Sequence, residues 1–291
     1  MQIITPAYLC ENPLPDHDGA GDKQQRGRVL VVAGSRENPG AAFLASLGVL
    51  RAGAGILQVA TCDSAATHLR MAMPEALVVG CYETMAGGLS PASGTRLVEL
   101  ASGCDAVLIG PGMVDEEAVA ELTTTLLKDS SGARFVLDAE AFVQMRIDTD
   151  RLKRQGGRVV VTPHSGEMAK FLGGKRDEID QEPEASAQRA CELTGAVVAL
   201  KGAVTHIVSP TGDTWLCNHG CIGLATSGSG DTLAGILAGL IARGAELGLA
   251  ASWSVYMHAE AGRRLTKKVG SVGFLAREIP DEIPRIMQDL K

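Results

Sequence analysis

The sequence contains few aromatic residues and has no excess of positive charge. Phe, Trp and Tyr make up 3% of its 291 residues, and the formal net charge is −7. Proteins that hold single-stranded nucleic acid stack its bases on aromatic rings, and nucleic-acid binding in general relies on clustered Lys and Arg. The composition therefore argues against a nucleic-acid partner.

The chain also lacks a long apolar run and a basic, apolar start. Its longest apolar stretch is 233–242, whereas a helix needs about 20 residues to span a membrane. Residues 1–10 have neither the charged start nor the apolar centre of a secretory signal. We therefore expect a cytoplasmic protein with no membrane segment.

Seven cysteines are scattered along the chain, and without a signal segment we interpret them as reduced thiols. One cluster, Cys217-Asn218-His219-Gly220-Cys221, contains residue types that bind zinc. No second ligand pair follows at the spacing of a zinc finger. The spacing therefore favours incidental thiols in a turn over a zinc site.

Runs rich in Val, Ile and Leu alternate with helical patterns along most of the chain. The runs predicted as strands are 28–33, 56–61, 76–79, 106–109, 135–138, 159–162 and 197–200. Continuous apolar runs are typical of strands covered on both faces, and their alternation with helices predicts βαβ units. We expect an α/β fold, a three-layer helix–sheet–helix sandwich with a mostly parallel central sheet.

We expect a single domain over residues 1–291, with residues 1–27 as an N-terminal extension, because no linker or internal repeat divides the chain. Two short runs, 205–209 and 214–217, predict a hairpin at the edge of the sheet. The last third is helical, and its large side chains Trp253, Tyr256 and Met257 are predicted to lie in the core rather than at an interface. The predicted helices are 40–53, 64–71, 92–101, 115–128, 139–147, 165–172, 184–194, 230–243, 248–267 and 276–289.

A glycine-rich turn opens one of the last helices. Gly228-Ser229-Gly230-Asp231 precedes an apolar helical face that begins at Leu233. The free N–H groups of such a turn, together with the helix dipole, form an anion site. Asp231 can accept a proton from a substrate hydroxyl; alternatively, Asp231 or Ser229 only caps the helix. A carboxylate at a helix N-terminus tends to have a lowered pKa, which predicts a weak base until phosphate occupies the turn.

Polar and glycine residues also follow other predicted strands, where ligands bind in open α/β sheets. They are Ala41, Gly112, Asp138, the segment His164 to Glu167 and the segment Lys201 to Thr205. Each has a plainer explanation. Ala41 and Gly112 suit tight packing, Asp138 and the His164 segment suit helix capping, and Lys201 suits the surface.

These segments resemble the ADP/ATP-dependent NAD(P)H-hydrate dehydratases, a family of the ribokinase-like superfamily. Gly228-Ser229-Gly230-Asp231 is similar to the G-x-G-D signature of that superfamily. The resemblance extends in the right order over residues 28–275. Its other segments include Pro39-Gly40-Ala41, Ile109-Gly110-Pro111-Gly112, Thr162-Pro163-His164-Ser165-Gly166-Glu167-Met168 and Leu200-Lys201-Gly202-Ala203.

The resemblance implies repair of NADHX and NADPHX, the hydrated forms of the reduced nicotinamide cofactors. ADP, with ATP as the alternative donor, phosphorylates the ring hydroxyl, and elimination of phosphate then regenerates NADH or NADPH. Mg²⁺ is the implied cofactor, and a homo-oligomer, a tetramer, is the implied assembly. A separate NAD(P)HX epimerase is expected, because only 27 residues precede the first predicted strand.

The resemblance also assigns roles to individual residues. Asp231 is the implied catalytic base, and Ala41, Gly112, His164 and Asp231 are the implied contacts to the hydrated dinucleotide. The implied nucleotide site consists of Lys201, Gly202, Ala203, Val204, Thr205 and Gly230. Gly228, Ser229 and Gly230 form the implied anion hole, and Glu167 is expected to act on a metal through water.

Two other functions remain open. A small-molecule hydroxyl kinase of the same superfamily is disfavoured by His164, which stands where many such kinases have Asn, and by Pro39-Gly40-Ala41. A non-catalytic nucleotide sensor is disfavoured because Asp231, Lys201 and His164 are all present.

Overall fold

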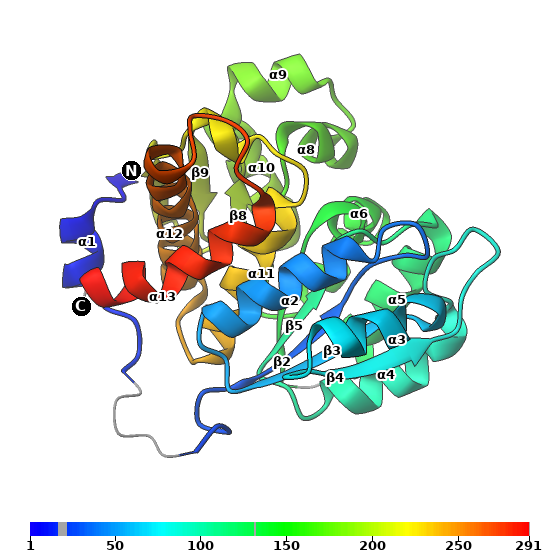
Figure 1. The fold of residues 1–291 in the computed structure, drawn as a ribbon. Helices are drawn as coiled ribbons and strands as arrows, with labels where there is room; N and C mark the ends of the chain where they lie inside the picture. Colours follow the sequence, from blue (N-terminus) through cyan, green and yellow to red (C-terminus); the bar gives the residue numbers. More distant parts are fainter. Residues whose placement is uncertain (17–21, 131, 291) are drawn as a thin grey trace.

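The computed structural model describes residues 1–16, 22–130 and 132–290, and a ten-stranded sheet runs through it (Figure 1). The strand order is β1-β10-β9-β8-β7-β6-β5-β2-β3-β4, and every neighbouring pair is parallel except β8–β9 and β9–β10. The strands are β1 (Gln2–Ile3), β2 (Arg28–Val32), β3 (Ile56–Cys62), β4 (Leu77–Cys81), β5 (Ala106–Ile109), β6 (Arg134–Leu137), β7 (Val159–Val161), β8 (Val197–Leu200), β9 (Thr205–Val208) and β10 (Thr214–Cys217).

The predicted parallel strands are confirmed, and most of their side chains are buried because helices cover both faces of the sheet. Every residue of β5 and β8, for example, is buried. The predicted edge position of the hairpin is wrong. Strands β9 and β10 do pair in antiparallel fashion, but β1 adds in parallel outside β10 and forms the edge itself. Two residues carry too little pattern to predict such a strand.

One helical layer covers the face of the sheet that is seen in front in Figure 1. It contains α2 (Gly40–Arg51), α3 (Asp63–Ala72), α11 (Ser229–Ala242), α12 (Leu247–Lys268) and α13 (Ile279–Asp289). Trp253, Tyr256 and Met257 are buried in this layer, as predicted. The short helix α1 (Pro6–Glu11) lies beside the end of α13, where the Cys10 thiol donates to the Leu290 carbonyl.

The second helical layer covers the opposite face. It consists of α4 (Gly94–Ala101), α5 (Glu116–Asp129), α6 (Ala139–Val143), α7 (Thr149–Lys153), α8 (Ser165–Leu172), α9 (Arg176–Gln181) and α10 (Pro183–Thr194). Short 3₁₀ turns are η1 (Pro91–Ser93), η2 (Gln144–Ile147), η3 (Ile222–Leu224) and η4 (Ala276–Glu278). Among the described residues, no helix is long and apolar enough to cross a membrane.

Helices α2 and α11 pack with their backbones in contact, because glycines remove side chains from the line of contact. A Cβ added to Gly235 would lie 2.0 Å from the Ala45 carbonyl oxygen, and one added to Gly239 would lie 2.8 Å from the Val49 carbonyl oxygen. On the other helix, a Cβ on Gly48 would lie 2.6 Å from the Thr232 carbonyl oxygen. This contact fixes the N-terminal end of α11 relative to the sheet.

Candidate active site

The predicted site residues lie at the carboxyl ends of five neighbouring strands, β8, β7, β6, β5 and β2. Lys201 follows β8 and His164 lies just beyond β7, and their backbones form a parallel bridge. Asp138 follows β6 directly, Gly112 lies in the turn after β5, and Ala41 lies in α2, which follows β2. The sheet order therefore brings together residues that are far apart in the sequence, and the glycine-rich start of α11 adjoins them.

Lys201 is held in a buried ion pair. Its Nζ lies 2.8 Å from Oδ1 of Asp138, and the same oxygen accepts a hydrogen bond of 2.7 Å from the Thr162 hydroxyl. The Lys201 side chain is 17% exposed, so it is no surface lysine. A Cβ on Gly230 would lie 3.3 Å from Nζ, which shows that the ammonium reaches the first turn of α11.

Lys201 carries its positive charge in this setting. Burial opposes the charged form, but the nearby carboxylates of Asp138, Glu167 and Asp231 outweigh burial and raise the pKa of Lys201. A fixed ammonium beside a helix N-terminus is suited to bind and neutralise phosphate oxygens.

Asp231 stands in the first turn of α11, and the capping explanation for it is wrong. The N-cap is Gly228, and no side chain caps the helix. The expected low pKa is also wrong. Burial, reinforced by the charges of Asp138 and Glu167, raises the pKa of Asp231 to about 6, although Lys201 acts in the opposite direction. Asp231 is thus tuned to exchange a proton near neutral pH even without a bound phosphate.

This raised pKa predicts a stability difference that depends on pH. The folded protein holds the Asp231 proton more tightly than the unfolded chain, so the wild-type free energy of unfolding falls as pH rises from about 4 to about 6. An Asp231→Asn variant lacks this titration. Its free energy of unfolding, relative to that of wild type, should therefore rise by roughly 2–3 kcal/mol between about pH 4 and about pH 6 and should not rise further at higher pH. Urea unfolding of both proteins from pH 4 to 8 checks this, and a constant difference would contradict the raised pKa.

The anion-hole prediction needs one correction. Gly228 has φ +85°, and a Cβ there would lie 2.3 Å from Leu44 Cδ1, so the turn requires glycine. The N–H of Ser229 donates to the Thr226 carbonyl at 3.3 Å and is not free. Within the described parts of the chain, the N–H groups of Gly228 and Gly230 make no hydrogen bond and remain available for an anion.

His164 and Glu167 form the capping box that was the plainer explanation of this segment. The His164 Nδ1 accepts from the N–H groups of Gly166 and Glu167 at 2.9 and 3.2 Å, and Glu167 Oε2 accepts from the His164 N–H at 2.8 Å. The His164 side chain is nevertheless 60% exposed and lines a pocket. Because Nδ1 is an acceptor, the neutral ring carries its proton on Nε2, 3.3 Å from Glu167 Oε1.

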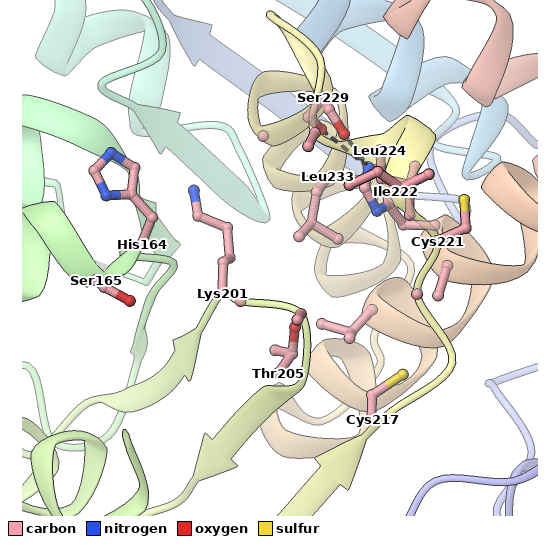
Figure 2. Close-up of a pocket in the computed structure, with 18 of the residues that line it drawn as sticks. His164, Ser165, Lys201, Thr205, Cys217, Cys221, Ile222, Leu224, Ser229 and Leu233 are labelled. Carbon is pink, nitrogen blue, oxygen red and sulfur yellow. Dashed lines mark hydrogen bonds between the residues drawn. The ribbon is translucent and has the colours of Figure 1, made fainter. Parts of the chain in front are cut away.

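A pocket of about 770 Å³ lies between α8, the segment after β8 and the start of α11 (Figure 2). Figure 2 shows His164 and Lys201 on one side, with Ser229, Leu224 and Ile222 on the other. The predicted nucleotide residues Lys201, Gly202, Ala203, Thr205 and Gly230 line it, whereas Val204 does not. No Phe, Trp or Tyr is among the described lining residues, so a base would pack on aliphatic side chains and backbone.

The predicted dinucleotide contacts Ala41 and Gly112 lie outside this pocket but close to each other. Gly112 has φ +64°, and a Cβ there would lie 2.4 Å from the Ala41 Cβ and 3.1 Å from Asn38 Nδ2. The Asn38 amide therefore also faces this part of the site, and the sequence analysis missed it. Asp231 likewise does not line the pocket.

The sequence did not indicate several lining residues of the pocket, among them Arg176, Asp180 and His258. Arg176 and Asp180 come from α9, which no apolar pattern predicts, because only Ile179 of that helix is buried. His258 lies in α12 with Nε2 3.0 Å from the Ser229 hydroxyl and 3.1 Å from its carbonyl oxygen. Burial lowers the pKa of His258 to about 4, so the ring is neutral. Its contacts to Ser229 hold the start of α11 in place.

His219, from the candidate zinc cluster, makes other contacts. Its Nε2 lies 2.8 Å from Glu260 Oε2, and its ring stacks on Tyr256 at a centroid distance of 4.9 Å. Among the described residues, no group of three or more His, Cys, Asp or Glu side chains is placed to hold a metal ion. The Cys217 thiol is buried and its pKa is raised by burial.

The carboxylates near Lys201 suit Mg²⁺ only in part. Carboxylate oxygens are the ligands it prefers, and it keeps several waters when nucleotide phosphates complete its shell. Asp138, however, is already paired with Lys201, and one oxygen of Glu167 accepts the His164 N–H. The carboxylate oxygens that remain fit a hydrated ion held mainly by phosphates rather than one bound by several side chains.

The same fold occurs in solved structures. A ribokinase-like superfamily protein from Enterococcus faecalis is 26% identical, with a TM-score of 0.83 over 100% of this chain and 96% of its own. The ADP/ATP-dependent NAD(P)H-hydrate dehydratase of Bacillus subtilis, co-crystallised with ATP and Mg²⁺, is 26% identical, with a TM-score of 0.82 over 100% and 99%. The fold defines a protein of the ribokinase-like class.

The sequence comparisons narrow this class further. A family model described as NAD(P)H-hydrate dehydratase matches residues 29–285. An ADP-dependent (S)-NAD(P)H-hydrate dehydratase from Xanthomonas campestris is 44% identical over 100% of this chain and 97% of its own length. Bifunctional repair enzymes such as that of Moorella thermoacetica are longer, and the chain spans 54% of that relative. The chain belongs to the NAD(P)H-hydrate dehydratase family.

Proposed function

We propose that this protein uses ADP to dehydrate the S epimers of NADHX and NADPHX to NADH and NADPH. The observation that supports this most is the placement of Asp231. A carboxylate with its pKa raised to about 6 stands in the same helical turn as two free backbone N–H groups and beside the Lys201 ammonium. Such a site can take a proton from a hydroxyl and stabilise phosphate at the same point.

The first step is phosphoryl transfer to the ring hydroxyl. Asp231 accepts the hydroxyl proton while the oxygen attacks the terminal phosphorus of ADP, which forms the phosphate ester and releases AMP. The N–H groups of Gly228 and Gly230 and the Lys201 ammonium stabilise the charge on the phosphoryl oxygens. His164, at the mouth of the pocket, and Ala41 with Gly112, at the other strand ends, are the proposed contacts to the dinucleotide.

The second step is elimination. The lone pair of the ring nitrogen expels phosphate, and the neighbouring ring carbon then loses a proton to the departing phosphate, which restores the double bond. Phosphate is a far better leaving group than hydroxide, which is why the nucleotide is needed. The sum is NADHX and ADP converted to NADH, AMP and phosphate.

Mg²⁺ is proposed to bind on the nucleotide phosphates, with Glu167 as its protein partner through water. Bound there, it would neutralise phosphate charge. Glu167 suits such a second-layer position, because its carboxylate is held by the hydrogen bond that it accepts from the His164 N–H.

The direct test is to incubate the protein with (S)-NADHX and either ADP, ATP or no nucleotide. We expect the reduced-nicotinamide absorbance to return with ADP, more slowly with ATP, and not without nucleotide. AMP and phosphate should form in equal amounts with NADH. If neither nucleotide restores the absorbance, the proposed function is wrong.

The same assay distinguishes the proposed dehydratase from a hydroxyl kinase. A hydroxyl kinase would consume nucleotide and accumulate a stable phosphate ester without releasing phosphate. Adding the R epimer tests stereochemistry, because only the S epimer should be consumed unless an epimerase activity is supplied.

A further inference from the structure

Asp138 has no assigned role in the reaction, yet it is the most buried carboxylate of the site. It is 2% exposed, and its Oδ1 accepts from both the Thr162 hydroxyl and Lys201 Nζ. It stands at the N-cap position of α6 but makes no side-chain capping bond. The helix-capping explanation is therefore wrong, and the carboxylate is committed to Lys201.

We propose that Asp138 is a positioning residue that holds the Lys201 ammonium against the first turn of α11 and away from Asp231. This inference rests on the proposed function and adds to it how the base and the ammonium are kept apart. The proposal follows from the surroundings of Lys201, whose ammonium lies near the carboxylates of Asp138, Glu167 and Asp231.

The ion pairs show which carboxylate holds the ammonium. Among the described residues, Lys201 Nζ pairs with Asp138, whereas Glu167 and Asp231 lie beyond ion-pair distance. The hydroxyl of Thr162, which follows β7 directly, donates to the same Asp138 oxygen and holds the carboxylate in place. Nζ is thus fixed between the end of β6 and Gly230, where it can meet a phosphate without neutralising Asp231.

The charges that face Asp231 come from three other elements. They are Asp138 at the end of β6, Glu167 on α8 and Lys201 at the end of β8. The first two favour the protonated form of Asp231 and Lys201 disfavours it. Loss of the Asp138 charge removes a repulsion and frees the ammonium to pair with Asp231. Both effects make Asp231 a weaker base.

The test is the nearly isosteric Asp138→Asn variant in the dehydration assay with ADP. We expect kcat to fall by about 10- to 100-fold, and the KM for ADP to rise because the ammonium that meets the phosphates is no longer held in place. The acid limb of the pH–rate profile should move to lower pH by roughly one unit. Titration of ADP itself is common to both proteins, so the difference between profiles reports the enzyme.

Glu140→Gln is the matched control. Glu140 lies two residues away at the start of the same helix and accepts a hydrogen bond from Gln144 instead of facing Lys201. The kcat and KM of the Glu140→Gln variant should stay within about twofold of the wild-type values. The acid limb of its pH–rate profile should stay in place. A purely structural role for Asp138 would lower thermal stability and the active fraction but leave the acid limb in place.

A double-mutant cycle gives a second readout, because it compares the effect of Asp138→Asn with and without the lysine that it is proposed to hold. In a Lys201→Met background, adding Asp138→Asn should lower kcat by less than it does in the wild-type background, because the positioned group is already gone and only the loss of the Asp138 repulsion on Asp231 remains. Additive losses, or an acid limb that does not move, would overturn the inference. An inactive wild-type protein would instead overturn the proposed function, so the two failures are distinguishable.

Discussion

An Asp231→Asn variant is expected to lose dehydration by about 10²–10⁴-fold, the range that a general base contributes. The reason is that Asn cannot accept the hydroxyl proton, although it fills the same space at the start of α11. Nucleotide binding should be retained or tighter, since the variant removes a negative charge beside the phosphate site. Turnover of (S)-NADHX with ADP and nucleotide affinity by calorimetry check the two halves of this prediction.

The matched control is Asp281→Asn. Asp281 occupies the same third position of helix α13, but it pairs with Arg51 at the surface, with its side chain 63% exposed. Its substitution should leave turnover within about twofold of wild type. Near-normal turnover of Asp231→Asn itself would show that another group is the base.

A Gly235→Ala variant is expected to lose roughly 3 kcal/mol of stability or more. The added methyl would lie 2.0 Å from the Ala45 carbonyl oxygen, which is backbone and cannot rotate away. Helices α2 and α11 must then separate, and the start of α11 shifts relative to the strand ends. We expect the melting temperature to fall by roughly 5–10 °C, measured by circular dichroism, with loss of activity at temperatures where the fold persists.

Gly94→Ala provides the comparison for this prediction. Gly94 is also helical and buried, but a Cβ there would lie 3.5 Å from Thr125 Cγ2, an ordinary contact. This variant should be neutral or slightly stabilising, because alanine reduces the freedom of the unfolded chain. An equal loss in both variants would mean that the α2–α11 contact is not the cause.

The strands were predictable because burial on both faces leaves runs such as Val197–Leu200 apolar throughout. Elements that make few apolar contacts could not be predicted. Strand β1 has two exposed residues, and α9 buries only Ile179, so neither leaves a periodic signal. The sequence also does not specify the order of strands in the sheet. For this reason the β9–β10 hairpin was predicted at the edge, which β1 occupies.

The candidate site was predictable where glycine and charge follow a strand. The turn before Leu233 and the segment after β8 were found in this way. The pairing of Asp138 with Lys201 was not, because 63 residues separate them and only the sheet order makes β6, β7 and β8 neighbours. His258 was missed because it occupies a core position in the periodic pattern of α12. The pKa of Asp231 depends on burial, which local sequence does not specify.

The spacing of the five strand ends also fixes how far the site extends across the sheet. Adjacent strands lie 4.7–4.9 Å apart, so the four steps from β8 to β2 place the ends of these two strands about 19 Å apart. Backbone hydrogen bonds of the sheet, rather than loops, set this length. A small alcohol would touch only part of it, whereas an extended dinucleotide lying across the strand ends can contact both extremes at once.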